Sequence, residues 1–229
     1  MILPGAEPIQ RDIMPVQVKI CGINSVTAAD SAVRTGAEFG GLVFFAKSPR
    51  NLTLDQAAPL AARMRGRLKL AALVVDESDD TLAAISQRIK PDFFQLHGKE
   101  TPQRVAEIVA RFAIPAIKAL AITEPGDLAK LTAYEQMAEM FLFDAAPADG
   151  ATRPGGHGAA FDWRMLKDKD VRRPWFLAGG LDPENVAQAI EVSGATRVDV
   201  SSGVESAPGV KSDARIAEFV AAAKAKVGA

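Results

Sequence analysis

The only cysteine of the chain, Cys21, ends the apolar stretch VQVKIC and is followed by a glycine. A lone cysteine is most often a small buried hydrophobic residue. Side chains of a strand alternate between its two faces, so Lys19 would share a face with Cys21, while Val18 and Ile20 would face the other way. A buried lysine needs a partner, and its charge would favour the thiolate of a neighbouring cysteine, whose reference pKa is about 8.5. The spacing therefore favours a role as a base for Cys21 over simple packing.

A candidate general acid closes another apolar run, FLFD, at Asp144. By alternation Asp144 shares a face with Leu142, whereas Phe141 and Phe143 face outward. A carboxyl group held at the apolar end of a strand is suited to giving up a proton during a reaction. The alternatives are an aspartate that caps a neighbouring loop or one that pairs with Lys19.

Two further ionisable side chains follow short apolar runs, Arg50 in FFAKSPRNL and His97 in QLHG. The planar fork of an arginine matches a substrate carboxylate, although a solvated loop arginine has the same spacing. His97 would share a strand face with Gln95, which suits a structural histidine as well as a proton carrier. His157 lies in a glycine-rich stretch, where the alternative to a role in the site is a simply exposed side chain.

Small residues form two turns near the C-terminus. Gly179 and Gly180 follow one apolar run, and Ser202 and Gly203 follow another that contains Asp199. Where side chains are this small, an anion can approach the backbone N–H groups closely. A single Gly-Gly corner is ordinary turn chemistry, but two such turns in succession favour a phosphate-binding pocket.

These candidates need elements to position them, and the sequence alternates short β-branched apolar runs with amphipathic stretches. Helical spacing is clear at Val105, Ile108, Val109 and Phe112. Repeated βα units without a Pro/Gly/Ser-rich linker predict one α/β domain, a single (β/α)₈ TIM barrel of eight parallel strands with outer helices. The predicted strands are 16–21, 39–45, 68–75, 93–96, 116–121, 140–144, 175–178 and 197–200, and the predicted N-caps are Ser25, Thr53, Asp79, Thr101, Asp182 and Ser212.

A barrel of this kind carries its active site at the C-terminal ends of the strands, where all the candidates lie. The loops after the seventh and eighth strands commonly bind phosphate, as the two small-residue turns would. Cys21 on the first strand and Asp144 on the sixth would flank an anchored ligand from different sides. The connection 145–160 contains four glycines and favours a mobile lid over a merely tolerated insertion.

Composition narrows the partners and the compartment. The chain has 229 residues, 48% of them hydrophobic, with a formal net charge of −1, which disfavours a nucleic-acid surface. No apolar stretch reaches the about 20 residues that span a bilayer, so no membrane partner is expected. A single cysteine fits a reducing cytoplasm. Residues 1–15, with three prolines, predict a loose N-terminal extension ahead of a barrel domain over 16–229.

Taken together, seven motifs carry a family resemblance. KICGI, FFAKSPRNL, QLHG, FLFD, PGGHGAAFDW, LAGGLDPENV and VDVSSGVESAPGVKS occur in this order from Lys19 nearly to the C-terminus. The chain resembles the phosphoribosylanthranilate isomerases. This resemblance implies a (β/α)₈ barrel that catalyses an Amadori rearrangement in tryptophan biosynthesis, from N-(5-phosphoribosyl)anthranilate to 1-(2-carboxyphenylamino)-1-deoxyribulose 5-phosphate.

The resemblance also implies roles for individual residues. Asp144 would protonate the ribose ring oxygen as general acid, and Cys21 would remove the C2 proton as general base. Arg50 would hold the anthranilate carboxylate, and Asp199 would lie near the sugar hydroxyls. The phosphate would be bound at Gly179, Gly180, Ser202 and Gly203, and His97 is counted among the substrate-binding residues without a defined role. Neither a metal nor another cofactor is expected, and the chain is expected to be a monomer or homodimer.

Two alternatives remain at this point. The first is another phosphosugar barrel enzyme, such as the indoleglycerol-phosphate synthase of the same pathway, whose expected set of lysine and glutamate side chains is missing. The second is a barrel that binds a phosphorylated ligand without turnover. The presence of Cys21, Asp144 and Arg50 at three separate strand ends disfavours the second.

Overall fold

The structure, a computed structural model, describes residues 15–145, 161–167 and 169–225. The predicted N-terminal extension, apart from Pro15, lies outside the described residues. The same holds for His157 and for the predicted lid, apart from Ala145.

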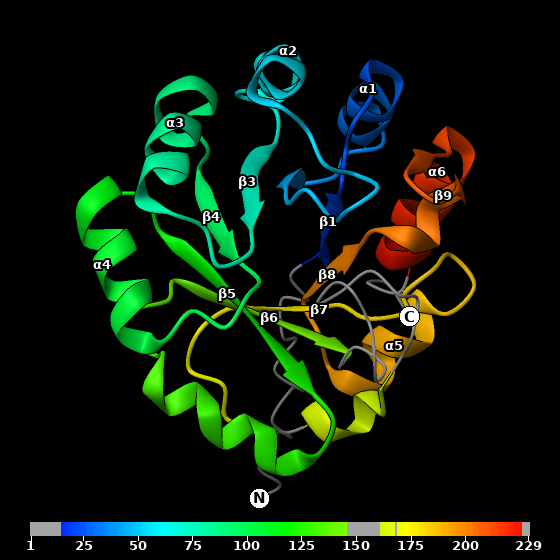
Figure 1. The fold of residues 1–229 in the computed structure, drawn as a ribbon. Coiled ribbons are helices and arrows are strands. Elements are labelled where there is room, and N and C mark those ends of the chain that lie inside the picture. Colours follow the sequence, from blue (N-terminus) through cyan, green and yellow to red (C-terminus); the bar gives the residue numbers. More distant parts are fainter. Residues whose placement is uncertain (1–14, 146–160, 168, 226–229) are drawn as a thin grey trace, which may run out of the picture.

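The strands close into a parallel barrel in chain order, with the first strand paired to the last (Figure 1). This confirms the predicted fold, and every strand boundary agrees with the prediction to within one residue. The strands are β1 (Gln17–Cys21), β2 (Phe39–Phe44), β3 (Lys69–Val74), β4 (Phe93–Leu96), β5 (Ala116–Ile122), β6 (Met140–Ala145), β7 (Trp175–Leu177) and β8 (Arg197–Val200).

Helices surround the barrel, and most begin at the predicted caps. The side chains of Ser25, Thr53, Thr101 and Ser212 each accept a backbone N–H of the first turn, and Thr53 forms a capping box with Gln56. The α-helices are α1 (Val26–Arg34), α2 (Leu54–Met64), α3 (Asp79–Ile89), α4 (Pro102–Phe112), α5 (Val186–Ser193) and α6 (Asp213–Lys224).

Two cap predictions are wrong. Ser78 caps α3 by accepting the N–H of Thr81, so Asp79 is the first helical residue instead. Asp182 accepts the N–H groups of Glu184 and Asn185 in a turn, and α5 begins only after that turn. In both places an aspartate or serine satisfies free N–H groups, but its exact position relative to the helix depends on the turn geometry.

Short 3₁₀ helices replace α-helices after β5 and β6. They are η1 (Pro125–Ala133) and η2 (Trp163–Leu166), and a third, η3 (Ser202–Val204), follows β8. Proline and glycine open η1, and both have poor α-helical propensity. After η3 an unpredicted antiparallel hairpin, β9 (Glu205–Ala207) and β10 (Val210–Lys211), returns towards β1 before α6 begins.

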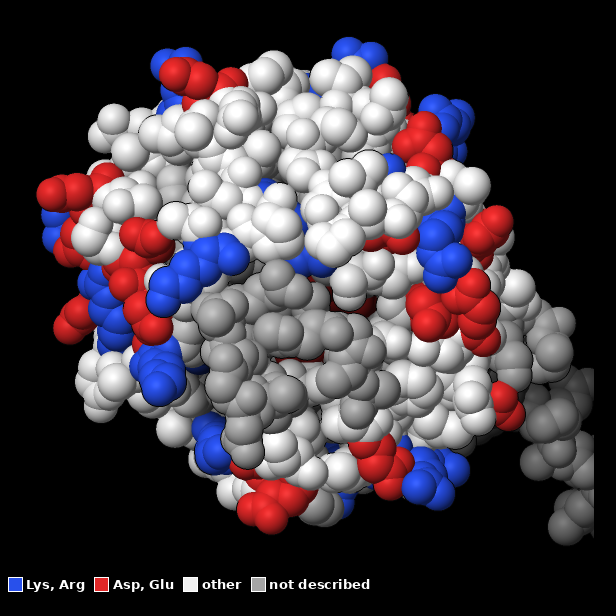
Figure 2. Space-filling view, turned by 45° about the vertical axis from the view of Figure 1, so that its right-hand side comes forward, with Lys and Arg blue, Asp and Glu red and all other residues white. Residues whose placement is uncertain are grey.

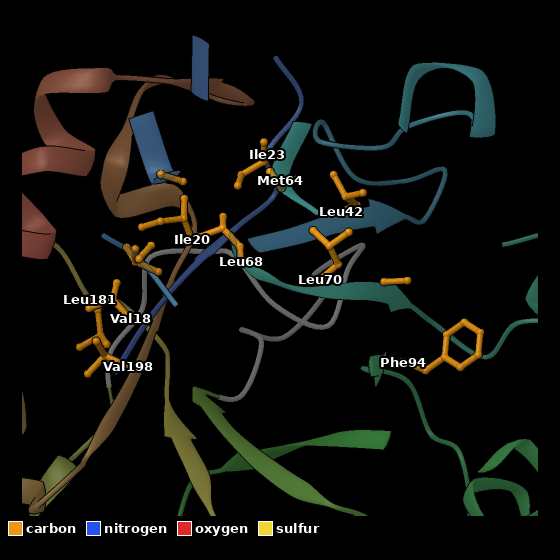
Figure 3. Packing of buried hydrophobic residues seen from close by; sticks show 14 of the residues in the cluster. Val18, Ile20, Ile23, Leu42, Met64, Leu68, Leu70, Phe94, Leu181 and Val198 are labelled. Atoms are coloured by element: carbon orange, nitrogen blue, oxygen red, sulfur yellow. The ribbon is translucent and has the colours of Figure 1, made fainter. Parts of the chain in front are cut away.

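Two hydrophobic layers fix which side chains face the barrel interior. Val18, Ile20, Phe141 and Phe143 belong to the layer between strands and helices, part of which is drawn in Figure 3. Leu142 belongs to the separate interior cluster. These assignments confirm the predicted alternation along β1 and β6. The neighbouring positions at 19, 21 and 144 therefore face the interior, where a polar side chain needs a partner.

Charged side chains of both signs lie next to one another on the face shown in Figure 2. Examples of surface ion pairs are Arg104 with Asp79, at 2.6 Å, and Arg88 with Asp55, at 2.7 Å. Among the described residues no helix is long and apolar enough to cross a membrane. The same part of the chain holds no cluster of three or more His, Cys, Asp or Glu side chains suited to a metal ion.

Candidate active site

Cys21 lies on the interior wall of β1, beside a buried ion pair. The Lys19 Nζ donates to Asp199 Oδ1 at 2.8 Å across the β1–β8 pairing, and Lys19 is fully buried. A Cβ placed on Gly41 would lie 3.0 Å from the Cys21 Sγ and 3.2 Å from the Lys19 Nζ, so both atoms fill the space above that glycine. Lys19 pairs with Asp199, so its alternative pairing with Asp144 is wrong.

Burial and the neighbouring lysines act in opposite directions on the pKa of the Cys21 thiol. Burial raises the pKa of the Cys21 thiol, and the nearby Asp199 carboxylate raises it further. Lys19 and Lys211 lower the pKa of the same thiol, which is the predicted direction for Lys19, but burial outweighs them. Burial also acts to lower the pKa of Lys19, yet the contacts with Asp199 and Cys21 leave it raised. Lys19 is therefore charged, and Cys21 is held as a thiol.

Arg50 lies on the same side of the barrel mouth as Cys21, and the Glu205 carboxylate binds it there. Its Nε donates to Glu205 Oε1 at 2.6 Å and its Nη2 to Glu205 Oε2 at 2.8 Å. Arg50 is only 5% exposed, so the alternative of a solvated loop arginine is wrong. Gly22, at a φ of +74°, makes room for this side chain, because a Cβ there would lie 2.4 Å from the Arg50 Cδ. Arg50 is thus fixed beside the strand that carries Cys21.

Lys211 joins this group from the hairpin. Its Nζ donates to Glu205 Oε1 at 2.8 Å and to the Ser201 carbonyl at 2.8 Å. Burial lowers the pKa of Lys211, and Glu205 opposes that effect. Burial alone would raise the pKa of Glu205, but Arg50, Lys211 and the Gly209 N–H hold it at about 2. The wall formed by β1, β2 and the hairpin therefore combines a thiol with three buried cations.

Asp144 lies on another wall, at the end of β6, with His97 from the end of β4. The Asp144 Oδ2 lies 3.3 Å from the His97 Nε2, and the two side chains are 12% and 11% exposed. The Asp144 Oδ1 accepts the Ala145 N–H at 2.8 Å. On its other side, the His97 Nδ1 lies 3.1 Å from the Gln95 Nε2, and Gln95 is fully buried. His97 thus bridges a buried amide and the predicted acid.

The two small-residue turns lie against each other. A Cβ on Gly203 would lie 1.9 Å from the Leu181 carbonyl oxygen, which directly follows the Gly179–Gly180 turn. Gly179 and Gly180 have positive φ angles of 82° and 65°, and the N–H groups of both have no backbone acceptor among the described residues. The structure therefore brings the four predicted phosphate-binding positions, Ser202 included, into one place at the ends of β7 and β8.

Glu205 and Lys211 escaped the sequence analysis although both lie within the quoted motif VDVSSGVESAPGVKS. The signal that could have found them is the Ala-Pro-Gly turn between them, which is typical of a chain reversal. Such a reversal brings a lysine that follows β8 back towards Cys21.

Fold and site together define a class, a (β/α)₈-barrel enzyme with ionisable side chains gathered at its C-terminal mouth. The family model described as N-(5'phosphoribosyl)anthranilate (PRA) isomerase matches residues 18–222. The chain therefore belongs to the N-(5'-phosphoribosyl)anthranilate isomerase family, and it is an isomerase of tryptophan biosynthesis. This confirms the resemblance and sets aside both alternatives, the synthase of the same pathway and a barrel without turnover.

Individual relatives agree with this assignment. An N-(5'-phosphoribosyl)anthranilate isomerase from Rhodopseudomonas palustris (strain BisA53) is 50% identical over 212 residues, 93% of this chain and 97% of the relative. One from Cereibacter sphaeroides (strain ATCC 17023) is 49% identical over 91% of this chain and 99% of the relative. The crystal structure of phosphoribosyl anthranilate isomerase from Thermotoga maritima has a TM-score of 0.82 at 33% identity, covering 92% of this chain and 99% of that one.

A solved structure of the same family contains a ligand. It is a phosphoribosyl anthranilate isomerase in complex with reduced 1-(o-carboxyphenylamino)-1-deoxyribulose 5-phosphate, and it matches with a TM-score of 0.77 at 30% identity over 92% of this chain.

Proposed function

We propose that this chain converts N-(5'-phosphoribosyl)anthranilate into 1-(2-carboxyphenylamino)-1-deoxyribulose 5-phosphate, with Asp144 as general acid and Cys21 as general base. The observation that carries the proposal is their placement on different walls of one barrel mouth, beside the two adjoining turns of β7 and β8. A phosphate anchored at those turns leaves the sugar between the two side chains. The reaction is a sequence of proton transfers and needs no redox or metal cofactor.

Asp144 acts in the first step. Its proton goes to the ribose ring oxygen, the bond from C1 to that oxygen breaks, and the nitrogen lone pair forms the Schiff base. His97 contacts the Asp144 carboxyl group through its Nε2, at 3.3 Å from Oδ2. The Gln95 Nε2, 3.1 Å from the His97 Nδ1, is a donor, so Nδ1 accepts from it and the proton of the neutral ring is on Nε2. Nε2–H then donates to the carboxylate that remains on Asp144 after the transfer.

Cys21 acts in the second step. Its thiol first loses a proton to the solvent, and the thiolate then removes the C2 proton. The electron pair of the C2–H bond forms the C1–C2 double bond, the C=N pair of the Schiff base moves to nitrogen, and the resulting enolamine tautomerises to the ketone. A thiol with a raised pKa is a stronger base once it is ionised, and Lys19 and Lys211 stabilise the thiolate at that stage. Lys19 supplies the positive charge beside the sulfur, and its ion pair with Asp199 fixes the position of that charge.

The two ends of the substrate have their own contacts. Arg50 has Nη1 available for the anthranilate carboxylate, since only its Nε and Nη2 donate to described residues. Asp199 uses Oδ1 for Lys19, and its Oδ2 is left for a sugar hydroxyl. The phosphate is bound by backbone N–H groups at Gly179, Gly180, Ser202 and Gly203.

The substrate contains anthranilate, whose fluorescence reports its consumption. We expect the fluorescence to fall with time when the protein is added, and the rate to be proportional to protein concentration. A flat trace with a correctly folded protein, checked by circular dichroism, would contradict the proposed activity. Arg50→Met should raise KM for this substrate by about tenfold or more, the loss of one charge-assisted contact, while Arg111→Met on the outside of α4 should leave KM unchanged.

The compartment, the assembly and the domain boundary are also proposals. A single cysteine and a net charge of −1 support a cytoplasmic protein without a nucleic-acid partner. A monomer or homodimer is expected, and one structural relative from Thermotoga maritima is described as a dimeric phosphoribosylanthranilate isomerase from which monomers were generated. Sedimentation at several concentrations distinguishes the two states. Removing residues 1–15 should leave activity unchanged if the barrel domain begins at residue 16.

A further inference from the structure

A buried ion pair outside the proposed catalytic set lies between the barrel and the helices. Lys118 is in the middle of β5, where AIKALAI is otherwise apolar, and it is only 1% exposed. Its Nζ donates to Glu100 Oε2 at 2.8 Å. Neighbouring residues of β5 show its direction, since Ile117 and Ala119 belong to the interior cluster. Lys118 therefore points to the outer side, away from the substrate.

Both members of the pair hold the turn that carries His97. The Lys118 Nζ also donates to the Leu96 carbonyl at 3.1 Å and to the Gly98 carbonyl at 2.9 Å. The Glu100 carboxylate accepts the Gly98 N–H at 3.0 Å. The bonds therefore fasten the backbone immediately before and immediately after His97.

The same carboxylate ties this turn to the end of β3. The Glu100 Oε1 accepts the Asp76 N–H at 3.0 Å, and the Asp76 Oδ1 accepts the Lys99 N–H at 2.7 Å. A Cβ on Gly98 would lie 2.4 Å from the Asp76 Oδ1, so the turn has little room to shift towards β3. The turn at 96–100 is thus fixed from β3 and from β5.

A buried ion pair of this kind contributes little to the net free energy of folding. Removing two charges from water costs several kcal/mol for each ion, and well-packed apolar residues often serve as well or better. Lys118 and Glu100 both form hydrogen bonds with the 96–100 turn, and that turn presents His97 to Asp144 at 3.3 Å. This distance is at the long end for a hydrogen bond, so a small displacement of the turn breaks the contact.

We propose that Lys118 and Glu100 are positioning residues for the general acid, because they hold the 96–100 turn where the His97 imidazole reaches Asp144. They do not touch the substrate and act only through His97. The inference rests on the proposed function, in which Asp144 gives its proton to the sugar.

The test compares Lys118→Met, Glu100→Gln and the double variant with Lys130→Met. Lys130 is the matched control, because it also forms an ion pair, with Asp127 in η1, but its side chain is 64% exposed. Lys118→Met alone leaves a buried carboxylate without its cation and is expected to lower Tm. The double variant removes both charges and should recover most of that Tm. Its activity should not recover: kcat should fall about tenfold or more while KM stays within about threefold, because misplacement of a catalytic contact by about 1 Å can cost about 100-fold.

A spectroscopic readout separates positioning from folding. The chain has two histidines, so ¹⁵N imidazole spectra with His157→Gln as background report His97 alone. We expect the His97 ring nitrogens to shift in Glu100→Gln and in the double variant, and to be unchanged in Lys130→Met. The double variant leaves no unpaired buried charge, so it provides a folded variant even if Lys118→Met does not fold.

The outcomes are distinct. Folded variants with wild-type kcat and an unchanged His97 spectrum would overturn the positioning role and leave the proposed function intact. A loss of kcat that only parallels the loss of Tm, and recovers in the double variant, would likewise overturn it in favour of plain stability. An inactive wild-type protein would instead contradict the proposed function itself.

Discussion

Glu205 offers a quantitative test of the charge arrangement around Cys21. Its side chain is 4% exposed and accepts hydrogen bonds from Arg50, Lys211 and the Gly209 N–H. Burial acts to raise its pKa, but these contacts lower it from 4.5 to about 2. Because the folded-state pKa is lower than the unfolded one, the stabilisation is fully present above about pH 4.5 and is lost as the pH falls towards 2.

The magnitude follows from this difference. A pKa lower by about 2.5, at about 1.4 kcal/mol for each pH unit, corresponds to about 3.5 kcal/mol of unfolding free energy. About 1.4 kcal/mol of it is lost by pH 3.5, where the unfolded carboxyl is mostly protonated. At pH 7 Glu205→Gln should cost about 3–5 kcal/mol, since it leaves Arg50 and Lys211 buried without their carboxylate.

Urea unfolding of the wild type and Glu205→Gln, followed by circular dichroism at pH 7 and pH 3.5, measures both effects. The difference in unfolding free energy between the two proteins should shrink by about 1.4 kcal/mol at the lower pH. Glu107→Gln is the control, because Glu107 is 67% exposed and its change should stay within about 0.5 kcal/mol. An equal difference at both pH values, or a cost below about 1 kcal/mol at pH 7, would refute the reasoning.

Three further predictions follow from single contacts. Gly203→Ala should raise KM by about tenfold or more and lower Tm, because its Cβ would lie 1.9 Å from the Leu181 carbonyl oxygen. Gly126→Ala is the control and should change neither KM nor Tm, since the nearest atom to its Cβ is 3.6 Å away. Steady-state kinetics measures KM and calorimetry measures Tm, and equal effects of the two substitutions would contradict this prediction. Thr53→Ala removes a capping box and should cost about 1 kcal/mol, seen as a Tm lower by about 2–4 °C; an unchanged Tm would argue against the cap. Alkylation of Cys21 by iodoacetamide should reach half its maximal rate at a higher pH than that of free cysteine, about 8.5, and a lower midpoint would contradict the effect of burial.

The barrel was predictable because βα units repeat along the chain, and the facing of its side chains was predictable because they alternate along each strand. This alternation placed Val18 and Phe141 against the helices correctly, and it placed Cys21 and Asp144 in the interior. Alternation along one strand does not determine which residue a buried charge pairs with, since that depends on the pairing of strands that are distant in the sequence. For this reason the partner of Lys19, Asp199 on β8, was missed.

Parts of the site depend on tertiary contacts that no local pattern contains. The Glu205 carboxylate that holds Arg50 lies on a hairpin that approaches the loop after β2 closely, since a Cβ on Gly209 would lie 2.7 Å from the Pro49 carbonyl oxygen. The net raised pKa of Cys21 likewise reflects complete burial, which the sequence cannot give. Lys118 stands out as a lysine in an apolar run, but its partners lie on a turn that precedes its own strand.

The central claim is that Asp144 and Cys21 carry successive proton transfers in one turnover. Its most direct test is kcat for the isomerisation, followed by the fluorescence of the anthranilate substrate, in Asp144→Asn, Cys21→Ser and the wild type. Each substitution should lower kcat by at least about 100-fold, the low end for a positioned acid or base, while circular dichroism shows an unchanged fold. Near-wild-type turnover in both variants would contradict the assignment of the acid–base pair.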